Sequence, residues 1–194
     1  MAKKPEIYVS VDIEADGPIP GPHSMLSIGA VAYDETGAYV DEYAANLEAL
    51  PDAEPYPKTM EWWRQFPEAW AAIREDTRPP ETVMPEFADW VEALPGTAIF
   101  VAWPATFDFM WIYWYLIRFT GRRPFSEHGI DMRSYAMGMR KKDFRHSGKN
   151  YLPQRWFSAS PHTHVAIDDA REQGELFVRM MAENLGKAPP DNDG

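Results

Sequence analysis

One stretch near the N-terminus restricts the fold of this chain more than any other. Residues 7–15, IYVSVDIEA, alternate between aliphatic side chains and largely polar ones, which is the period-two pattern of a β-strand with one apolar face. A second strand is predicted at residues 25–33, MLSIGAVAY, and a turn at residues 35–37 leads into a third strand near residues 38–46. Because these segments follow one another through close turns, we expect the three strands to pair antiparallel.

Helical patterns dominate the remainder of the chain. Thr59 is expected to cap a short helix, Pro67 to open the next, and the apolar stripe after Pro85 predicts an amphipathic helix. Helices are predicted over residues 60–65, 68–75, 85–94, 107–120 and 164–185 and up to about residue 140, and strands over residues 98–103 and 129–132. Residues 141–162 are basic and polar without a clear period, so we expect a mobile loop there. This order of elements predicts an α/β sandwich with a mixed sheet of about five strands.

Length and composition indicate one folded domain. With 194 residues, 45% of them hydrophobic, the chain can bury one substantial core and is hardly long enough for two. We expect residues 1–186 to form the domain and residues 187–194 a frayed tail. The most apolar window, residues 107–117, is about half as long as a membrane span of ~20 residues. The chain lacks cysteine and an apolar signal segment, so we expect a cytoplasmic protein that does not enter membranes.

Charge is distributed unevenly along the sequence. The net charge is −11, yet residues 118–155 contain ten Lys and Arg against three acidic side chains, which gives this segment +7 and leaves −18 for the rest. A local basic surface is what contact with phosphate groups requires, whatever the total charge. The main candidates for such contacts are Arg140, Lys141, Lys142, Arg145 and Lys149. The alternative is a basic loop that is simply solvated.

Asp12 and Glu14 form the first feature that indicates chemistry. Their spacing places both carboxylates on one face of a strand whose other face is aliphatic. Two anions this close repel each other unless a cation lies between them, and a divalent ion with oxygen ligands fits that need. The alternative is a solvated face with ordinary surface acids. A calcium loop of the EF-hand type is excluded, because its twelfth position should be Glu and is His23 here.

Two further acids lie on predicted helices. Asp108 opens the apolar helix at residues 107–120 and needs a partner there, which a metal would provide, although a plain first-turn acid at the helix dipole is the alternative. In the last helix, Asp169 shares its face with Gln173, Leu176, Phe177 and Met180, whereas Asp168 shares its face with charged residues. Asp169 is therefore the inward carboxylate. His164, just before this helix, could reach a site near Asp169, but a lone His at a helix start is more often a cap or a surface residue.

Taken together, these residues resemble the three motifs of the DEDDh exonucleases. The three segments are Val11-Asp12-Ile13-Glu14-Ala15-Asp16-Gly17, Phe107-Asp108 and His164-Val165-Ala166-Ile167-Asp168-Asp169-Ala170. They span residues 11–170 in the order typical of that superfamily, and the last has its spacing of His, Ala and Asp. Residues 59–65, TMEWWRQ, are similar to the small bacterial and phage subgroup of 3′–5′ exoribonucleases and exodeoxyribonuclease VIII-like proteins.

The resemblance implies a ribonuclease H-like three-layer fold and a hydrolytic mechanism. Two ions, Mg²⁺ or Mn²⁺, are expected on Asp12, Glu14, Asp108 and Asp169, with Asp12 bridging both and His164 acting as general base. The expected activity is removal of nucleoside 5′-monophosphates from the 3′ ends of RNA or DNA, and the subgroup favours RNA. A non-catalytic nucleic-acid-binding protein on the same fold is the alternative from a different class.

Substrate contacts are predicted from the same resemblance and from residue type. Met25 and Leu26 follow the first motif, where relatives place an apolar wedge against the terminal base. Trp62, Trp103 and Phe107 could stack on bases, although in a chain with eight Trp and ten Phe each such residue is more often part of the core. Many relatives carry Asn four residues before the second-motif Asp; this chain has Pro104 there, so that role is absent or is met differently, for example by Thr106. Whether the chain forms a homodimer is left open.

Overall fold

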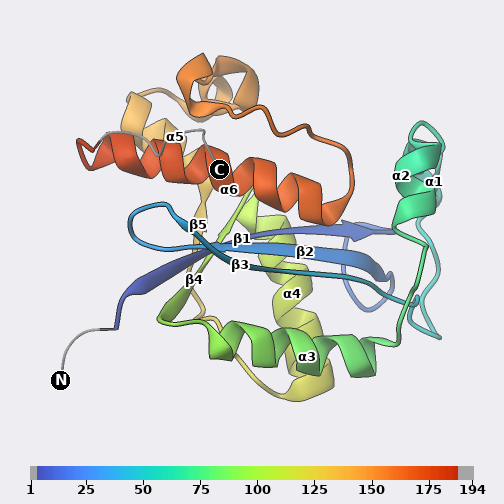
Figure 1. The fold of residues 1–194 in the computed structure, drawn as a ribbon. Coiled ribbons are helices and arrows are strands. Elements are labelled where there is room, and N and C mark those ends of the chain that lie inside the picture. Colours follow the sequence, from blue (N-terminus) through green and yellow to red (C-terminus); the bar gives the residue numbers. More distant parts are fainter. Residues whose placement is uncertain (1–3, 188–194) are drawn as a thin grey trace.

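The computed structural model describes residues 4–187, which form a five-stranded mixed sheet between two helical layers (Figure 1). The strands are β1 (Glu6–Ala15), β2 (Met25–Tyr33), β3 (Tyr39–Asn46), β4 (Thr97–Ala102) and β5 (Gly129–Asp131), in the order β3-β2-β1-β4-β5. β1 pairs antiparallel with β2, and β2 with β3, whereas β4 runs parallel to β1 and β5 parallel to β4. The predicted α/β sandwich, with three antiparallel strands at the start of a mixed sheet, is confirmed.

Helices cover both faces of the sheet. They are α1 (Pro57–Trp63), α2 (Pro67–Ala72), α3 (Pro80–Ala93), α4 (Ala105–Thr120), α5 (Met132–Arg140) and α6 (Ala166–Asn184). Figure 1 shows α5 and α6 on one face, α3 and α4 on the other, and the short pair α1 and α2 beside one end of the sheet. In the part of the chain described, no helix is long and apolar enough to cross a bilayer.

The alternation in β1 divides the interior into two cores. Ile7, Val9, Val11 and Ile13 point into a core shared with α3 and α4. On the opposite face, Tyr8 packs on Phe177 of α6 with ring centroids 5.3 Å apart. The polar half of the alternation therefore faces α6, and this is the face that carries Asp12 and Glu14.

Two glycines let α6 approach the sheet closely. A Cβ on Gly29 of β2 would lie 2.3 Å from the carbonyl carbon and oxygen of Ala166, and one on Gly174 of α6 would lie 2.4 Å from the ring of Tyr33. Neither position has room for a larger side chain without movement of the backbone or of a buried ring. Because Gly29 pairs with Asp12 across the β1–β2 ladder, the first turn of α6 is brought directly over the acidic part of β1.

The structure corrects several predicted boundaries. The helix expected from Pro85 starts at Pro80 and includes Pro85, and α1 starts at Pro57, so that Thr59 is internal and not a cap. The last helix starts at Ala166 rather than at His164, because His164 has a left-handed φ of +59° that a helix cannot contain. Of the tail expected at residues 187–194, residues 188–194 lie outside the described residues.

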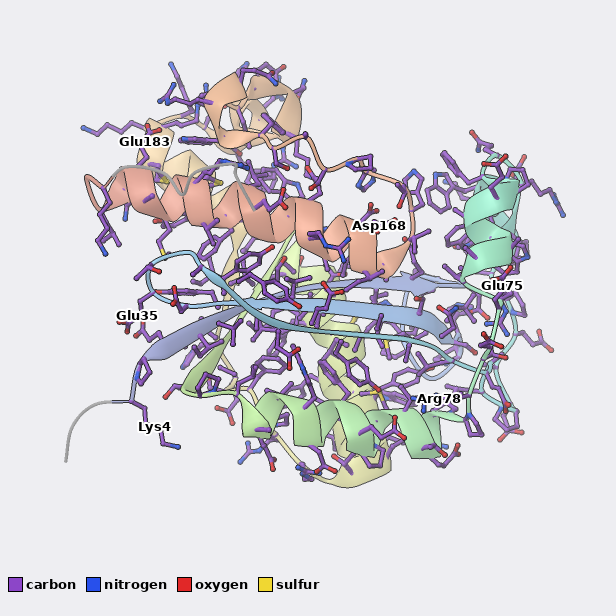
Figure 2. All side chains as sticks on the ribbon, in the orientation of Figure 1. Lys4, Glu35, Glu75, Arg78, Asp168 and Glu183 are labelled. Carbon is purple, nitrogen blue, oxygen red and sulfur yellow. The ribbon has the colours of Figure 1, made fainter. Side chains whose placement is uncertain are left out.

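Residues 141–162 contain more local structure than predicted. They contain three 3₁₀ turns, η1 (Phe144–Ser147), η2 (Lys149–Tyr151) and η3 (Gln154–Trp156). Leu152 and Trp156 are buried in the same core cluster as residues of α6, and the Trp156 indole donates a 2.6 Å hydrogen bond to Glu183. Figure 2 shows Glu183 at the end of α6 beside this segment. The expected loop therefore contains anchors, without helical or strand periodicity, that attach part of it to α6.

Candidate active site

Asp12 and Glu14 lie on β1 where its pairing with β4 has ended. The β1–β4 ladder stops at Ser10, while α6 covers the face that carries the two acids. Each side chain is only 9% exposed. The face is therefore not a solvated surface, which was the alternative interpretation of the Asp-x-Glu pair.

Asp108 reaches the same place from the first turn of α4. It is 2% exposed, and its Oδ1 accepts a hydrogen bond of 3.2 Å from the backbone N–H of Ile13. The start of α4 is itself held by Asp131 at the end of β5, whose two carboxylate oxygens accept from the N–H groups of Ala105 and Ser134. One acid at the end of β5 thus binds the first turns of both α4 and α5, and this fixes where Asp108 points.

Asp169 enters from the first turn of α6. It is 1% exposed, and its two oxygens accept hydrogen bonds from the backbone N–H groups of Thr163 (2.8 Å) and His164 (3.2 Å). Asp168 instead binds Arg171 and the Thr163 hydroxyl with a side chain that is 39% exposed, beside the loop that leads into α6 (Figure 2). Helical spacing in the sequence predicts the same difference, with Asp169 pointing inward and Asp168 pointing outward.

The carboxylates perturb one another strongly. Burial, followed by repulsion from neighbouring acids that include Asp108, raises the pKa of Asp12 and of Glu14 well above the usual range. Burial raises the pKa of Asp108 to about 8, although the hydrogen bond from Ile13 opposes the shift. Such a cluster holds protons or cations in preference to standing fully ionised.

The donor set fits a hard divalent cation. Asp12, Glu14 and Asp169 each offer a carboxylate oxygen, and these oxygens lie within 4.8 Å of one another. Asp108 stands beside this group, close enough to raise the pKa of Asp12. A site made of carboxylate oxygens suits Mg²⁺ or Mn²⁺.

His164 lies at the edge of this cluster of four carboxylates and is packed against aromatic rings. Its imidazole lies 4.3 Å from the ring of Phe66 and 5.0 Å from that of Trp62, measured between centroids. Burial and the neighbouring His162 lower the pKa of His164, while Asp169 opposes the shift. The imidazole is therefore kept in its neutral form, in which one ring nitrogen can accept a proton.

Gln173 is a site residue to which the sequence analysis gave no function. Its Nε2 donates a 2.6 Å hydrogen bond to Oδ1 of Asp12, and its Oε1 accepts one of 2.9 Å from the backbone N–H of Trp103. The side chain is 2% exposed. Its place on the inward face of α6, four residues after Asp169, is the only signal in the sequence, and that signal fits a core residue equally well.

The residues predicted to contact substrate fall into two groups. Met25 and Leu26 are 0% and 2% exposed, so the structure does not bring the expected wedge to a surface, because β2 is covered throughout its length. Phe107 and Trp103 are half-buried. Trp62 is 37% exposed next to His164, which leaves part of its ring open beside the carboxylate group.

Much of the basic segment is already engaged within the protein. Arg122 pairs with Asp89 and Glu92, Lys149 with Glu172, and Arg155 with Glu183. Arg140 donates to the carbonyl of His146. Within residues 4–187, the exposed side chains of this segment that form no ion pair include Lys141, Lys142 and Arg145.

The sequence and the fold both match known nucleases. Residues 8–181 match the family described as the Rv2179c-like 3′–5′ exoribonuclease domain. This chain belongs to that family. It is also 32% identical over 181 residues to the 3′–5′ DNA exonuclease Cap18 of Escherichia coli, which covers 91% of this chain and 92% of the relative.

Solved structures place the fold in the same class. The nuclease domain of 3′hExo, a DEDDh family member bound to rAMP, has a TM-score of 0.68 at 10% identity over 98% of both chains. Pop2p of S. pombe, in a form with Mg²⁺ and Mn²⁺ bound, has a TM-score of 0.66 at 15% identity over 94% of this chain and 86% of that one. The predicted ribonuclease H-like fold and the resemblance to the DEDDh superfamily are confirmed.

Proposed function

We propose that this member of the Rv2179c-like family is a metal-dependent exonuclease that removes nucleoside 5′-monophosphates from the 3′ ends of RNA with two Mg²⁺ or Mn²⁺ ions. The observation that carries the proposal is the convergence of four buried carboxylates, from β1, α4 and α6, next to a histidine. These are the four acids and the histidine that the DEDDh motifs contain.

The carboxylates are assigned to metal binding. Asp12, Glu14, Asp108 and Asp169 would hold the ions. Gln173 binds one oxygen of Asp12 and so fixes the orientation of the other. When bound, the ions activate the attacking water and stabilise the leaving 3′ oxygen.

His164 is assigned the role of general base. Its lowered pKa keeps the ring unprotonated at neutral pH, so it can take the proton of the attacking water. Trp62 and Phe66 confine the ring, and the open part of Trp62 offers a surface on which a terminal base can stack. Phe107 is the second candidate for stacking.

Binding of the phosphate backbone of the substrate is assigned to the basic segment, residues 118–155. Lys141, Lys142 and Arg145 are exposed and form no ion pair within the described residues; with Arg140 they supply positive charge without breaking an existing pair. A cytoplasmic location stays a prediction from the sequence, and pairing with a second copy stays an open question.

DNA is the second candidate substrate. The family description favours RNA, as does the similarity of residues 59–65 to the exoribonuclease subgroup. The E. coli relative, however, is named a DNA exonuclease. The proposal commits to RNA and makes DNA the alternative outcome of the assay.

The test is a cleavage assay on 5′-labelled single-stranded and 3′-overhang RNA and DNA, with Mg²⁺ or Mn²⁺ and with EDTA as a control. A ladder that shortens from the 3′ end, absent with EDTA and in Asp12→Ala, is expected. Asp169→Ala should abolish cleavage as well, whereas Asp168→Ala, the adjacent and more exposed acid, should retain it. Cleavage by Asp12→Ala at the normal rate would refute the site, and a preference for DNA would refute the assignment to RNA.

A further inference from the structure

A second imidazole lies beside the cluster of four carboxylates and has no part in the proposed reaction. His162 comes from the loop between η3 and α6, two residues before the general base. Its Nδ1 lies 3.0 Å from Oδ2 of Asp169, and its ring centroid lies 4.6 Å from that of His164 at an interplanar angle of 76°. One ligand atom from each of His162, His164 and Asp169 falls within 4.8 Å of the other two.

The backbone is shaped to bring these three groups together. The N–H groups of Thr163 and His164 both donate to Asp169, so the loop wraps around this carboxylate. The left-handed φ of +59° at His164 is unusual for a residue with a side chain, and such conformations concentrate at functional sites. This turn is what holds both imidazoles next to the same acid.

The chemistry of this group differs from that of its neighbour. Asp12 and Glu14 offer only hard oxygen ligands, which suit Mg²⁺ and Mn²⁺. Two imidazoles and one carboxylate are instead a set that Zn²⁺ accepts, with a fourth position left for water. His162 is 48% exposed, so an ion can reach its ring from the solvent.

We propose that His162, His164 and Asp169 bind Zn²⁺ or a similar transition-metal ion, and that occupancy of this site stops the exonuclease. The ion takes the imidazole lone pair that His164 needs to accept a proton. It also takes a carboxylate oxygen of Asp169 that the catalytic ions need. The inhibitory part rests on the proposed function, whereas the binding part does not.

The competing interpretation is that His162 only donates a hydrogen bond to Asp169. A histidine in that role orients the carboxylate and gives no transition-metal affinity. Binding measured directly, without an activity readout, separates the two interpretations.

The binding test uses Zn²⁺ titration calorimetry and the visible absorption of Co²⁺, which is intense when the ion is tetrahedral. Both are performed on Asp12→Ala, which lacks a ligand of the neighbouring site and none of this one. We expect one Zn²⁺ site, weakened roughly tenfold or more when His162→Ala is added. His146→Ala is the matched control, because His146 is 51% exposed and lies 2.6 Å from an oxygen of Asp143, and it should change nothing. Equal Zn²⁺ affinity with and without His162 would overturn the proposal.

The inhibition test uses the native chain with Mg²⁺ and increasing Zn²⁺, each variant compared with its own rate in the absence of zinc. His162→Ala should raise the half-inhibitory Zn²⁺ concentration by the same factor as the loss of binding, and His146→Ala should not. Unchanged inhibition in His162→Ala would refute the inhibitory role. A protein that binds Zn²⁺ through His162 but cleaves no nucleic acid would refute the proposed function and leave the metal site standing.

Discussion

Substitution of Gly29 by Ala should move Asp169, on α6, away from Asp12, on β1. The added Cβ would lie 2.3 Å from the carbonyl carbon and oxygen of Ala166 and from the backbone N of Ile167, whereas unstrained carbon contacts lie at roughly 3.5–4.0 Å. The first turn of α6 must therefore move away from β2 by on the order of 1 Å. Overpacking of this kind costs about 1–3 kcal/mol, which lowers the melting temperature by roughly 2–12 °C for a chain of this size.

The same movement carries Asp169 away from Asp12, because Gly29 is the ladder partner of Asp12. A displacement of ~1 Å in a catalytic group can reduce turnover by about 100-fold, and the Mg²⁺ concentration for half-maximal activity should rise as well. The assay is a Mg²⁺ titration of exonuclease rate together with thermal unfolding.

Two other glycines provide controls for this experiment. Gly138→Ala meets nothing within 4 Å and lies inside α5, so it should stabilise the fold by about 0.5–1 kcal/mol without effect on Mg²⁺ dependence. Gly174→Ala clashes with the Tyr33 ring at 2.4 Å and should destabilise to a degree similar to Gly29→Ala. A folded Gly29→Ala protein with native turnover and native Mg²⁺ dependence would refute the claim that close packing of α6 on β2 sets the carboxylate geometry.

Three further predictions follow from the contacts of the site. Gln173→Leu removes the hydrogen bond to Asp12 and should weaken apparent Mg²⁺ affinity about 10–100-fold with an unchanged KM for oligonucleotide; a large change in KM alone would contradict the orienting role. Raised carboxyl pKa values, to about 8 for Asp108, mean that the metal-free fold holds protons that the unfolded chain loses near pH 4. Its melting temperature should therefore decrease as the pH rises from about 4 to about 8, and Mg²⁺ should raise the melting temperature more at pH 8 than at pH 4. A melting temperature that does not change with pH in EDTA would contradict the raised pKa values of these acids. Lys142→Ala with Arg145→Ala should reduce the slope of log affinity against log salt by about 1.4 for single-stranded substrate, whereas Arg122→Ala, already paired, should leave it unchanged.

The strands and buried helices could be predicted from the sequence because their signals are local. β2 was predicted with its exact bounds, since nine consecutive residues are apolar or small and all are buried. Gly121, with φ of +67°, ends α4 where the sequence placed the stop. In each case the residue types needed for the element lie within the element itself.

The errors occurred where a contact with another element decides the local conformation. The start of α6 was placed too early because the turn at His164 is set by hydrogen bonds to Asp169, five residues further on. Residues 141–162 were expected to be mobile because they have no period, yet Trp156 is fixed by burial and by Glu183, 27 residues away. Neither contact leaves a periodic trace in the sequence.

The same distinction separates the parts of the site. Strand and helix spacing singled out Asp12, Glu14 and Asp169, and the structure brings these three together. Gln173 and Gly29 were not identified as important to the site, because the function of each depends on what lies across from it. An amide on a buried helix face and a glycine in a strand look the same in sequence whether they support a site or only fill space.

The four clustered acids, Asp12, Glu14, Asp108 and Asp169, are brought together by apolar packing that lies at a distance from them. α6 is anchored by Leu176, Phe177 and Met180 in the second core, two turns or more beyond Asp169, and each such side chain contributes about 1.5–3 kcal/mol when fully buried. These contacts offset the burial and the mutual repulsion that raise the pKa of Asp12. We therefore expect the acids to be held together without a cation, unlike small metal-binding domains that fold only when the ion binds. In the proposed site, metal affinity would follow from the fold rather than cause it, and for this reason we expect Gly29 in β2 and Gln173 in α6 to control it without contacting the ion.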